Sequence, residues 1–213
     1  MEVAIAGGHG KIAMLLGRLL VGEGDLAFGL IRNPEQEDDL HEIGVEPVIC
    51  DLEGDDDVAG AVRGMDAIVY AAGAGAGSGA ERKRTMDLGG AVKLIEAARK
   101  EGVRRFVMVS AMGAADPPAE GDDVFAEYLR AKAAADAALR QSGLEYTIVR
   151  PGLLTDEPPR GSVKVGDRLE RGEIARADVA AVLFAVLRAR HTIDREFDLV
   201  SGREPIADAV AGL

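Results

Sequence analysis

Tryptophan is absent from this chain, and aromatic residues of any kind make up only 4% of it. Cysteine occurs once, at Cys50, so no disulfide can form within the chain and the fold is compatible with a reducing compartment. Because Cys50 ends an apolar run, we interpret it as a small buried residue rather than a nucleophile. With one cysteine and with His41 and His191 far apart, the sequence predicts no metal site, and it contains no nucleophile-elbow or P-loop pattern.

Positive charge is also scarce. The 25 lysines and arginines are outnumbered by 37 acidic residues, which gives a formal net charge of −12. A nucleic-acid backbone needs a basic face, so we expect no nucleic-acid partner. No apolar run is long enough to cross a bilayer, and the N-terminus begins in a predicted strand without the basic region of a secretory signal. We therefore expect a cytoplasmic protein with no membrane partner, either a monomer or a homodimer.

Glycine, in contrast, is abundant, and the first glycines follow a pattern. Residues 3–6 are apolar and predict a strand, and a helical apolar pattern begins after the glycines that follow. Gly7 suits a turn with unusual dihedral angles, Gly10 lets an anion approach the backbone, and Ala13 lets the helix pack on the strand. The helix N-terminus would then face a pyrophosphate, although a plain strand–helix turn remains the alternative. The candidate contacts are Gly7, Gly8, His9, Gly10, Lys11 and Ile12.

Strand-like and helix-like segments alternate along the rest of the chain. We expect strands at 26–31, 46–50, 66–70, 105–109, 146–149 and 196–200, and helices reaching residue 43 and over 81–101, 124–141 and 178–188. This alternation predicts an α/β fold with a doubly wound, mostly parallel sheet, strand order 3-2-1-4-5-6 plus a C-terminal strand. At 213 residues the chain fits a single domain. Residues from about 151 to 213 are expected to form a small appendix with short strands near Val163 and Leu169.

Several residues follow the predicted strands and so meet at one sheet edge. Arg32 ends the second strand, where an arginine can pair with a 2′-phosphate, which favours NADP over NAD; an exposed surface arginine is the alternative. Asp51 and Leu52 could bracket an adenine, unless Asp51 only caps the next helix. The small residues after the fourth strand would let a flat ligand pass close to the backbone. The candidate cofactor contacts here are Arg32, Asn33, Asp51, Leu52, Ala71, Ala72 and Gly73.

A second group of residues suggests chemistry. Tyr128 and Lys132 are four apart in a predicted helix and so share a face, and Ser110 ends the fifth strand. A lysine ammonium would lower the tyrosine pKa from about 10, and a serine hydroxyl can orient a substrate oxygen. The alternative is a packing role for Tyr128 and a surface charge at Lys132. The basic residues 82–84 in the first turn of the preceding helix are interpreted as solvated, and attraction to a phosphate of the ligand is the alternative.

Taken together, the segments GGHGKIA, AAG, YLRAK and RPG, with Ser110, resemble the short-chain dehydrogenase/reductase superfamily. GLEYTIVRPGLLTDEP and IARADVA are similar to its short atypical members, which are NAD(P)-binding and epimerase/dehydratase-like. Gly8 and His9 stand where relatives usually have Ala-Thr, so His9 is either a phosphate donor or an exposed loop residue. The resemblance implies a Rossmann fold and a bound dinucleotide, with contacts that include Lys132, Pro151, Gly152 and Leu153 in addition to the residues above.

The sequence thus predicts an NADP-binding oxidoreductase that acts on an unknown small carbonyl substrate, with Ser110, Tyr128 and Lys132 as catalytic residues. A non-catalytic NADPH-sensing protein is one alternative. An epimerase or dehydratase that uses tightly held NAD is the other.

Overall fold

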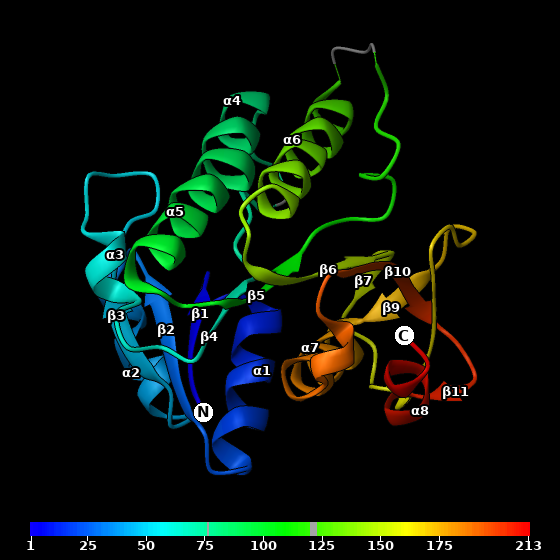
Figure 1. Cartoon of the computed structure of the whole chain (residues 1–213), viewed down its shortest axis with the longest axis horizontal. Coiled ribbons are helices and arrows are strands. Elements are labelled where there is room, and N and C mark those ends of the chain that lie inside the picture. The colour runs from blue at the N-terminus through cyan, green and yellow to red at the C-terminus, as the bar shows by residue number, and fades with distance from the viewer. Residues whose placement is uncertain (76, 120–122) are drawn as a thin grey trace.

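The computed structural model describes residues 1–75, 77–119 and 123–213 of the chain (Figure 1). Within these residues the main sheet has the order β11-β8-β10-β6-β5-β4-β1-β2-β3, which confirms the predicted doubly wound order 3-2-1-4-5-6. The pairings among the first six strands and β10 are parallel, whereas β8 is antiparallel to both β10 and β11. The strands are β1 (Glu2–Ala6), β2 (Leu26–Ile31), β3 (Glu46–Ile49), β4 (Ala67–Tyr70), β5 (Arg105–Val109), β6 (Glu145–Pro151), β8 (Ser162–Gly166), β10 (Arg195–Ser201) and β11 (Glu204–Pro205).

Helices cover both faces of this sheet. Helices α1 and α7 lie on one face, and α5 and α6 lie on the other (Figure 1). Residues of β1 alternate between the two layers: Val3 and Ile5 belong to one hydrophobic cluster, and Ala4 and Ala6 belong to the other. Such burial on both faces explains why the strand is apolar from Val3 to Ala6. The helices are α1 (Lys11–Gly22), α2 (Glu37–His41), α3 (Val58–Ala61), α4 (Ala80–Arg82), α5 (Ala91–Glu101), α6 (Val124–Arg140), α7 (Arg176–Arg188) and α8 (Ile206–Ala211), with short 3₁₀ turns η1 (Pro34–Gln36) and η3 (Arg190–Thr192).

The helix predicted over 81–101 is helical throughout but is not α-helical throughout. It begins as α4, continues as a π-helix, η2 (Lys83–Gly90), and ends as α5. A π-helix winds wider than an α-helix and changes which side chains face inward, and such segments are frequent at functional sites. Here it directs Lys83, Met86 and Asp87 into the protein interior.

The C-terminal part differs from the prediction in several strands. No strand forms at Leu169, because the side chain of Asp198, not a neighbouring strand, accepts the hydrogen bond of its backbone N–H at 3.1 Å. Instead, β7 (Leu153–Thr155) and β9 (Glu173–Ala175) pair in parallel as a separate two-stranded sheet that the sequence did not predict. Among the described residues, no helix combines the length and apolar character needed to cross a bilayer.

The parallel strands place their carboxyl ends along one sheet edge. Gly7 follows β1, Arg32 follows β2, Ala71 follows β4 and Ser110 follows β5. In doubly wound sheets, ligands bind outside this edge, where the strand order reverses. That reversal lies between β1 and β4, so the glycine turn after β1 sits at the expected place.

Candidate functional site

The glycine turn is fixed by close backbone contacts. Gly7 has φ +75°, and a Cβ atom at this position would lie 2.8 Å from the Cα atom of Ala72. A Cβ atom on Gly8 would lie 2.6 Å from the Cα atom of Gly29 in β2. The N–H of Gly10 donates to the carbonyl of Gly7 at 2.7 Å and closes the turn. These contacts confirm the predicted unusual geometry at Gly7 and show that Gly8 must also remain small.

Helix α1 begins directly after this turn with free backbone donors. Its N-cap is Gly10, which has no side chain to accept from the first-turn N–H groups, and the first turn contains no acidic residue. Uncapped N–H groups and the positive end of the helix dipole favour an anion at this position. The turn and helix therefore have the features of a phosphate site.

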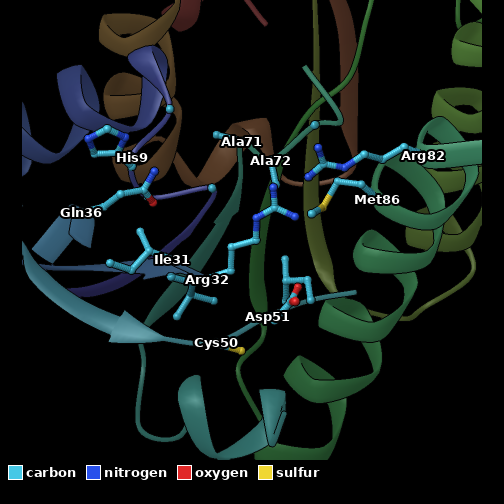
Figure 2. A pocket seen from close by; sticks show the side chains of 16 residues that line it. His9, Ile31, Arg32, Gln36, Cys50, Asp51, Ala71, Ala72, Arg82 and Met86 are labelled. Atoms are coloured by element: carbon cyan, nitrogen blue, oxygen red, sulfur yellow. The ribbon is translucent and has the colours of Figure 1, made fainter. Parts of the chain in front are cut away.

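A first cavity, of about 280 Å³, adjoins the turn (Figure 2). Its walls come from residues 7–10, 30–32, 50–52 and 71–73. Most of the cofactor contacts predicted from sequence are thus brought together: Gly7, Gly8, His9, Gly10, Arg32, Asp51, Leu52, Ala71, Ala72 and Gly73. Gln36 and Met86 also line it and were not predicted, and Arg82, which was interpreted as solvated, lines it as well.

Two arginines point toward each other across the first cavity (Figure 2). Arg32 and Arg82 both contact Oε2 of Glu53, at 3.3 and 3.2 Å, and the hydroxyl of Thr85 donates to Oε1 at 2.6 Å. Their side chains are 51% and 38% exposed, so both guanidinium groups remain accessible to a ligand. One carboxylate between two arginines leaves a local positive charge, which suits an anion such as a phosphate. The basic residues 82–84 were the signal that could have identified Arg82.

The remaining predicted contacts near this cavity have other partners. Asn33 caps η1 by accepting from the N–H of Glu35 at 3.2 Å, and it lies outside the lining. The Nζ atom of Lys11 pairs with Asp156 at 2.5 Å and also lies outside the lining. His9 lines the cavity while its Nε2 atom lies 2.6 Å from Oδ2 of Asp39.

Asp51 does not cap a helix, so that alternative is wrong. The N-cap of α3 is Asp57, whose side chain accepts from the N–H of Gly60 at 3.0 Å. Asp51 accepts instead from the N–H of Glu53 at 2.9 Å, which shapes the loop that places Leu52 and Glu53 beside the first cavity.

A second cavity, of about 730 Å³, continues from the first, and both are lined by residues 71–73. Ile12, Ser110, Tyr128 and Lys132 line it. The structure therefore brings the three candidate catalytic residues to one cavity beside the glycine turn.

Lys132 is buried and paired. Its Nζ atom lies 3.2 Å from Oδ1 of Asp87 and donates to the carbonyl of Val109 at 3.1 Å. The surface-charge alternative for Lys132 is therefore wrong. Asp87, which lies in the π-helix, also accepts from the N–H of Ala74 at 3.2 Å and so holds the loop after β4. Sequence analysis missed Asp87, because no spacing pattern links it to Lys132.

Tyr128 lies at the junction of this cavity with the next. Burial raises the pKa of the Tyr128 hydroxyl; the ammonium of Lys132 opposes this, and the carboxylate of Asp87 adds to it. The sequence-based expectation of a lowered pKa is therefore wrong, since burial outweighs the ammonium and Asp87 counters its charge. The Nζ atom of Lys83 lies 5.0 Å from the Tyr128 ring centroid, and Lys83 is only 9% exposed. The expectation that Lys83 is solvated is therefore wrong.

Ser110 is 3% exposed, and within the described residues its Oγ atom has no hydrogen-bond partner. Behind it, Asp136 pairs with Nε of Arg150 at 3.0 Å. Burial raises the pKa of the Asp136 carboxyl, and Arg150 and Ser110 oppose this rise. The Ser110 hydroxyl therefore lies close to the Asp136 carboxyl, and Ser110 also lines the second cavity, where a ligand can reach it.

A third cavity, of about 780 Å³, shares Ser110, Phe125 and Tyr128 with the second. Pro151, Gly152 and Leu153 line this third cavity and not the other two, so their contact with a cofactor stays a prediction.

Other reactive groups do not form a site. Among residues 1–75, 77–119 and 123–213, no group of three or more histidine, cysteine or acidic residues could hold a metal ion. Burial raises the pKa of the Cys50 thiol to about 11, with further contributions from Asp56 and Asp51. Cys50 is 3% exposed, which confirms the prediction of a buried residue.

Comparisons with known proteins agree with this geometry. The sequence model of the NAD(P)H-binding family matches residues 7–190. YhfK, an uncharacterized sugar epimerase of Bacillus subtilis, is 40% identical over 215 residues, with 100% of both chains covered. A Bacillus halodurans protein with the provisional name NAD-dependent epimerase/dehydratase superposes with a TM-score of 0.94 at 39% identity, with 100% of both chains covered. ChuY, an anaerobillin reductase from Escherichia coli O157:H7, superposes with a TM-score of 0.80 at 26% identity, covering 94% of this chain and 97% of that one.

Proposed function

The chain belongs to the NAD(P)H-binding family, and from that premise we propose that it is a reductase that uses NADPH to reduce a carbonyl group in a small molecule. The observation that carries the proposal is that Ser110, Tyr128 and Lys132 line one cavity next to the glycine turn. The similarity to an anaerobillin reductase supports the same type of reaction.

The residues of the first two cavities fit a dinucleotide. The backbone of the glycine turn, which has no room for a side chain at Gly7 and Gly8, would hold the pyrophosphate at the N-terminus of α1. Arg32 and Arg82 would bind the adenosine 2′-phosphate in place of Glu53, which favours NADPH over NADH. The second cavity would take the nicotinamide, and bound NADPH would supply the hydride.

The protein would supply the proton. Because burial raises the pKa of Tyr128, its phenol is protonated at neutral pH and can donate its proton to the carbonyl oxygen of the substrate. The carbonyl carbon gains the hydride, the oxygen gains this proton, and the product is an alcohol. The resulting phenolate lies near the ammonium of Lys132, which stabilises it until a proton from solvent restores the phenol. Ser110 would hold the substrate oxygen by a hydrogen bond.

A sugar epimerase or dehydratase is the second candidate, because two Bacillus relatives bear such names. The apolar lining of the third cavity, which includes Met112, Phe125 and Leu154, suits a sugar less well than a carbonyl compound with an apolar body.

The test is the Tyr128→Phe variant in a panel of aldehydes, ketones and quinones, with NADPH consumption followed by absorbance. We expect the variant to lose about 10²–10⁴-fold in kcat, with the Kd for NADPH unchanged. Tyr146→Phe is the matched control, because Tyr146 lines none of the three cavities. Undiminished turnover by Tyr128→Phe would show that another group donates the proton. An absence of turnover with every compound would favour a sensor that binds NADPH without reaction.

A further inference from the structure

Large apolar side chains are exposed around the third cavity. Phe125, at the start of α6, is 55% exposed, and Leu153, in β7, is 70% exposed. Single exposed apolar residues are ordinary on protein surfaces. These two, however, come from different elements and line the same cavity. The cavity therefore presents apolar walls to solvent, and a ligand with an apolar body would cover them.

The walls are held in place by local structure. The N–H of Leu153 donates to the carbonyl of Gly172 at 2.9 Å, and β7 pairs with β9 in the register Leu153 with Glu173. On the other side, the ring of Phe125 lies 6.1 Å from that of Tyr128, at an interplanar angle of 35°. An apolar body lying against Phe125 would thus have one end close to the Tyr128 hydroxyl.

The charged side chains that line the third cavity differ in whether they already have an ion-pair partner. Arg171, Glu173 and Arg176 all line it. Arg176 is already engaged, since its Nη1 atom lies 2.7 Å from Oδ1 of Asp156, which also pairs with Lys11. Arg171 is exposed and forms no ion pair within the described part of the chain. It is therefore the cation available to an acidic ligand, in a chain whose net charge is −12.

We infer that the third cavity selects substrates that combine an extended apolar body with an anionic group, with the body between Phe125 and Leu153 and the anion on Arg171. This inference rests on the proposed function only in placing the reacting carbonyl beside Tyr128. The binding preference itself follows from the walls and the charge. Glu173 lies two residues from Arg171 and opposes the anion, so it lowers the affinity that Arg171 alone would give.

Two fluorescent probes with the same aromatic skeleton test this preference. 8-Anilino-1-naphthalenesulfonate carries a sulfonate, and N-phenyl-1-naphthylamine is its neutral counterpart. Both are titrated into the wild-type protein with and without saturating NADP. The chain has no tryptophan, so the protein adds little background fluorescence. Because the measurement needs neither turnover nor NADPH, its result is independent of the proposed reductase activity.

We expect Arg171→Ala to weaken binding of the sulfonate by up to about 5-fold, the upper end of the range for an exposed ion pair, and to leave binding of the neutral probe unchanged. Glu173→Gln should strengthen binding of the sulfonate and leave binding of the neutral probe unchanged. Phe125→Ala should weaken binding of both probes. Arg168→Ala is the matched control, since Arg168 is exposed and lies three residues before Arg171 in the sequence but does not line the cavity.

Two results would overturn the inference. One is a loss of sulfonate binding in Arg171→Ala that is no larger than in Arg168→Ala or is shared by the neutral probe. The other is unchanged binding of both probes to Phe125→Ala, which would place them outside the third cavity. Loss of turnover in Tyr128→Phe bears on the proposed function and not on this preference.

Discussion

Asp87 and Lys132 form a buried ion pair in which Oδ1 and Nζ lie 3.2 Å apart and the side chains are 0% and 5% exposed. The pair joins the π-helix to α6, and it places a negative charge near the Tyr128 phenol as well as a positive one. The two charges act on the phenol in opposite directions, so Asp87 offsets the ammonium and burial keeps Tyr128 in the protonated form from which it can donate.

The first prediction concerns the opposing effects of Asp87 and Lys132 on the pKa of Tyr128. Asp87→Asn removes the negative charge that raises the pKa of Tyr128 and leaves the Lys132 ammonium unopposed, so the pKa of Tyr128 should fall. A spectrophotometric titration of tyrosinate should show one tyrosine ionising at lower pH than in the wild-type protein. The exposed Asp55→Asn variant serves as the control. Superimposable titration curves for Asp87→Asn and the wild-type protein would contradict the role given to Asp87.

A second prediction concerns the two arginines of the first cavity. Arg32→Ala and Arg82→Ala should each raise the Kd for NADPH about tenfold, which corresponds to loss of a charge-assisted hydrogen bond of about 1.4 kcal/mol. The Kd for NADH should not change, because NADH has no 2′-phosphate. Glu53→Gln should strengthen NADPH binding, since the carboxylate competes for both guanidinium groups. Fluorescence titration measures the Kd of each of these three variants for both cofactors, with the exposed Arg18→Ala as control. Equal effects on both cofactors would exclude a 2′-phosphate site here.

The glycine turn gives a third prediction, on stability. Gly7→Ala should lower the free energy of unfolding by about 1–3 kcal/mol, because alanine is strained at φ +75° and its Cβ atom would meet the backbone of Ala72. Gly22→Ala, near the end of α1, meets no atom within 4 Å and should be neutral or stabilising by about 0.5 kcal/mol. Urea denaturation measures both. A Gly7→Ala protein as stable as the Gly22→Ala protein would contradict the geometry of the turn.

The fold was predictable because its signals are local. Alternating apolar strands and helices fixed the strand order, since parallel strands with crossovers allow few arrangements. The paired strands β7 and β9 were missed because each has only three residues, too few to show a periodic pattern.

The site was predictable only in part, for a physical reason. Gly7, Arg32 and Ser110 follow strands and so could be located from the topology alone. Asp87 lies in the π-helix, whose wider turn changes which side chains face inward, and an α-helical pattern cannot predict that change. The sign of the pKa change at Tyr128 was wrong because the burial of its hydroxyl, which outweighs the Lys132 ammonium, could not be read from the sequence, and Asp87 in the π-helix adds to the effect of burial.

A fourth prediction concerns the single thiol. Burial raises the pKa of Cys50 from 9.0 to about 11, so the folded protein should resist Ellman's reagent at pH 8 and react only when unfolded. The folded state holds this proton more tightly than the unfolded state, so its contribution to stability is present below about pH 9 and is lost as the pH rises toward 11. Rapid labelling of the folded protein would show that Cys50 is accessible.

The most direct measurement of the central claim is a crystal structure of the protein with NADP. The account predicts the adenosine 2′-phosphate between Arg32 and Arg82, the pyrophosphate on the glycine turn and the nicotinamide ring in the second cavity beside Tyr128. Density for a dinucleotide whose nicotinamide lies away from Ser110, Tyr128 and Lys132, or no bound dinucleotide at saturating NADP, would contradict it.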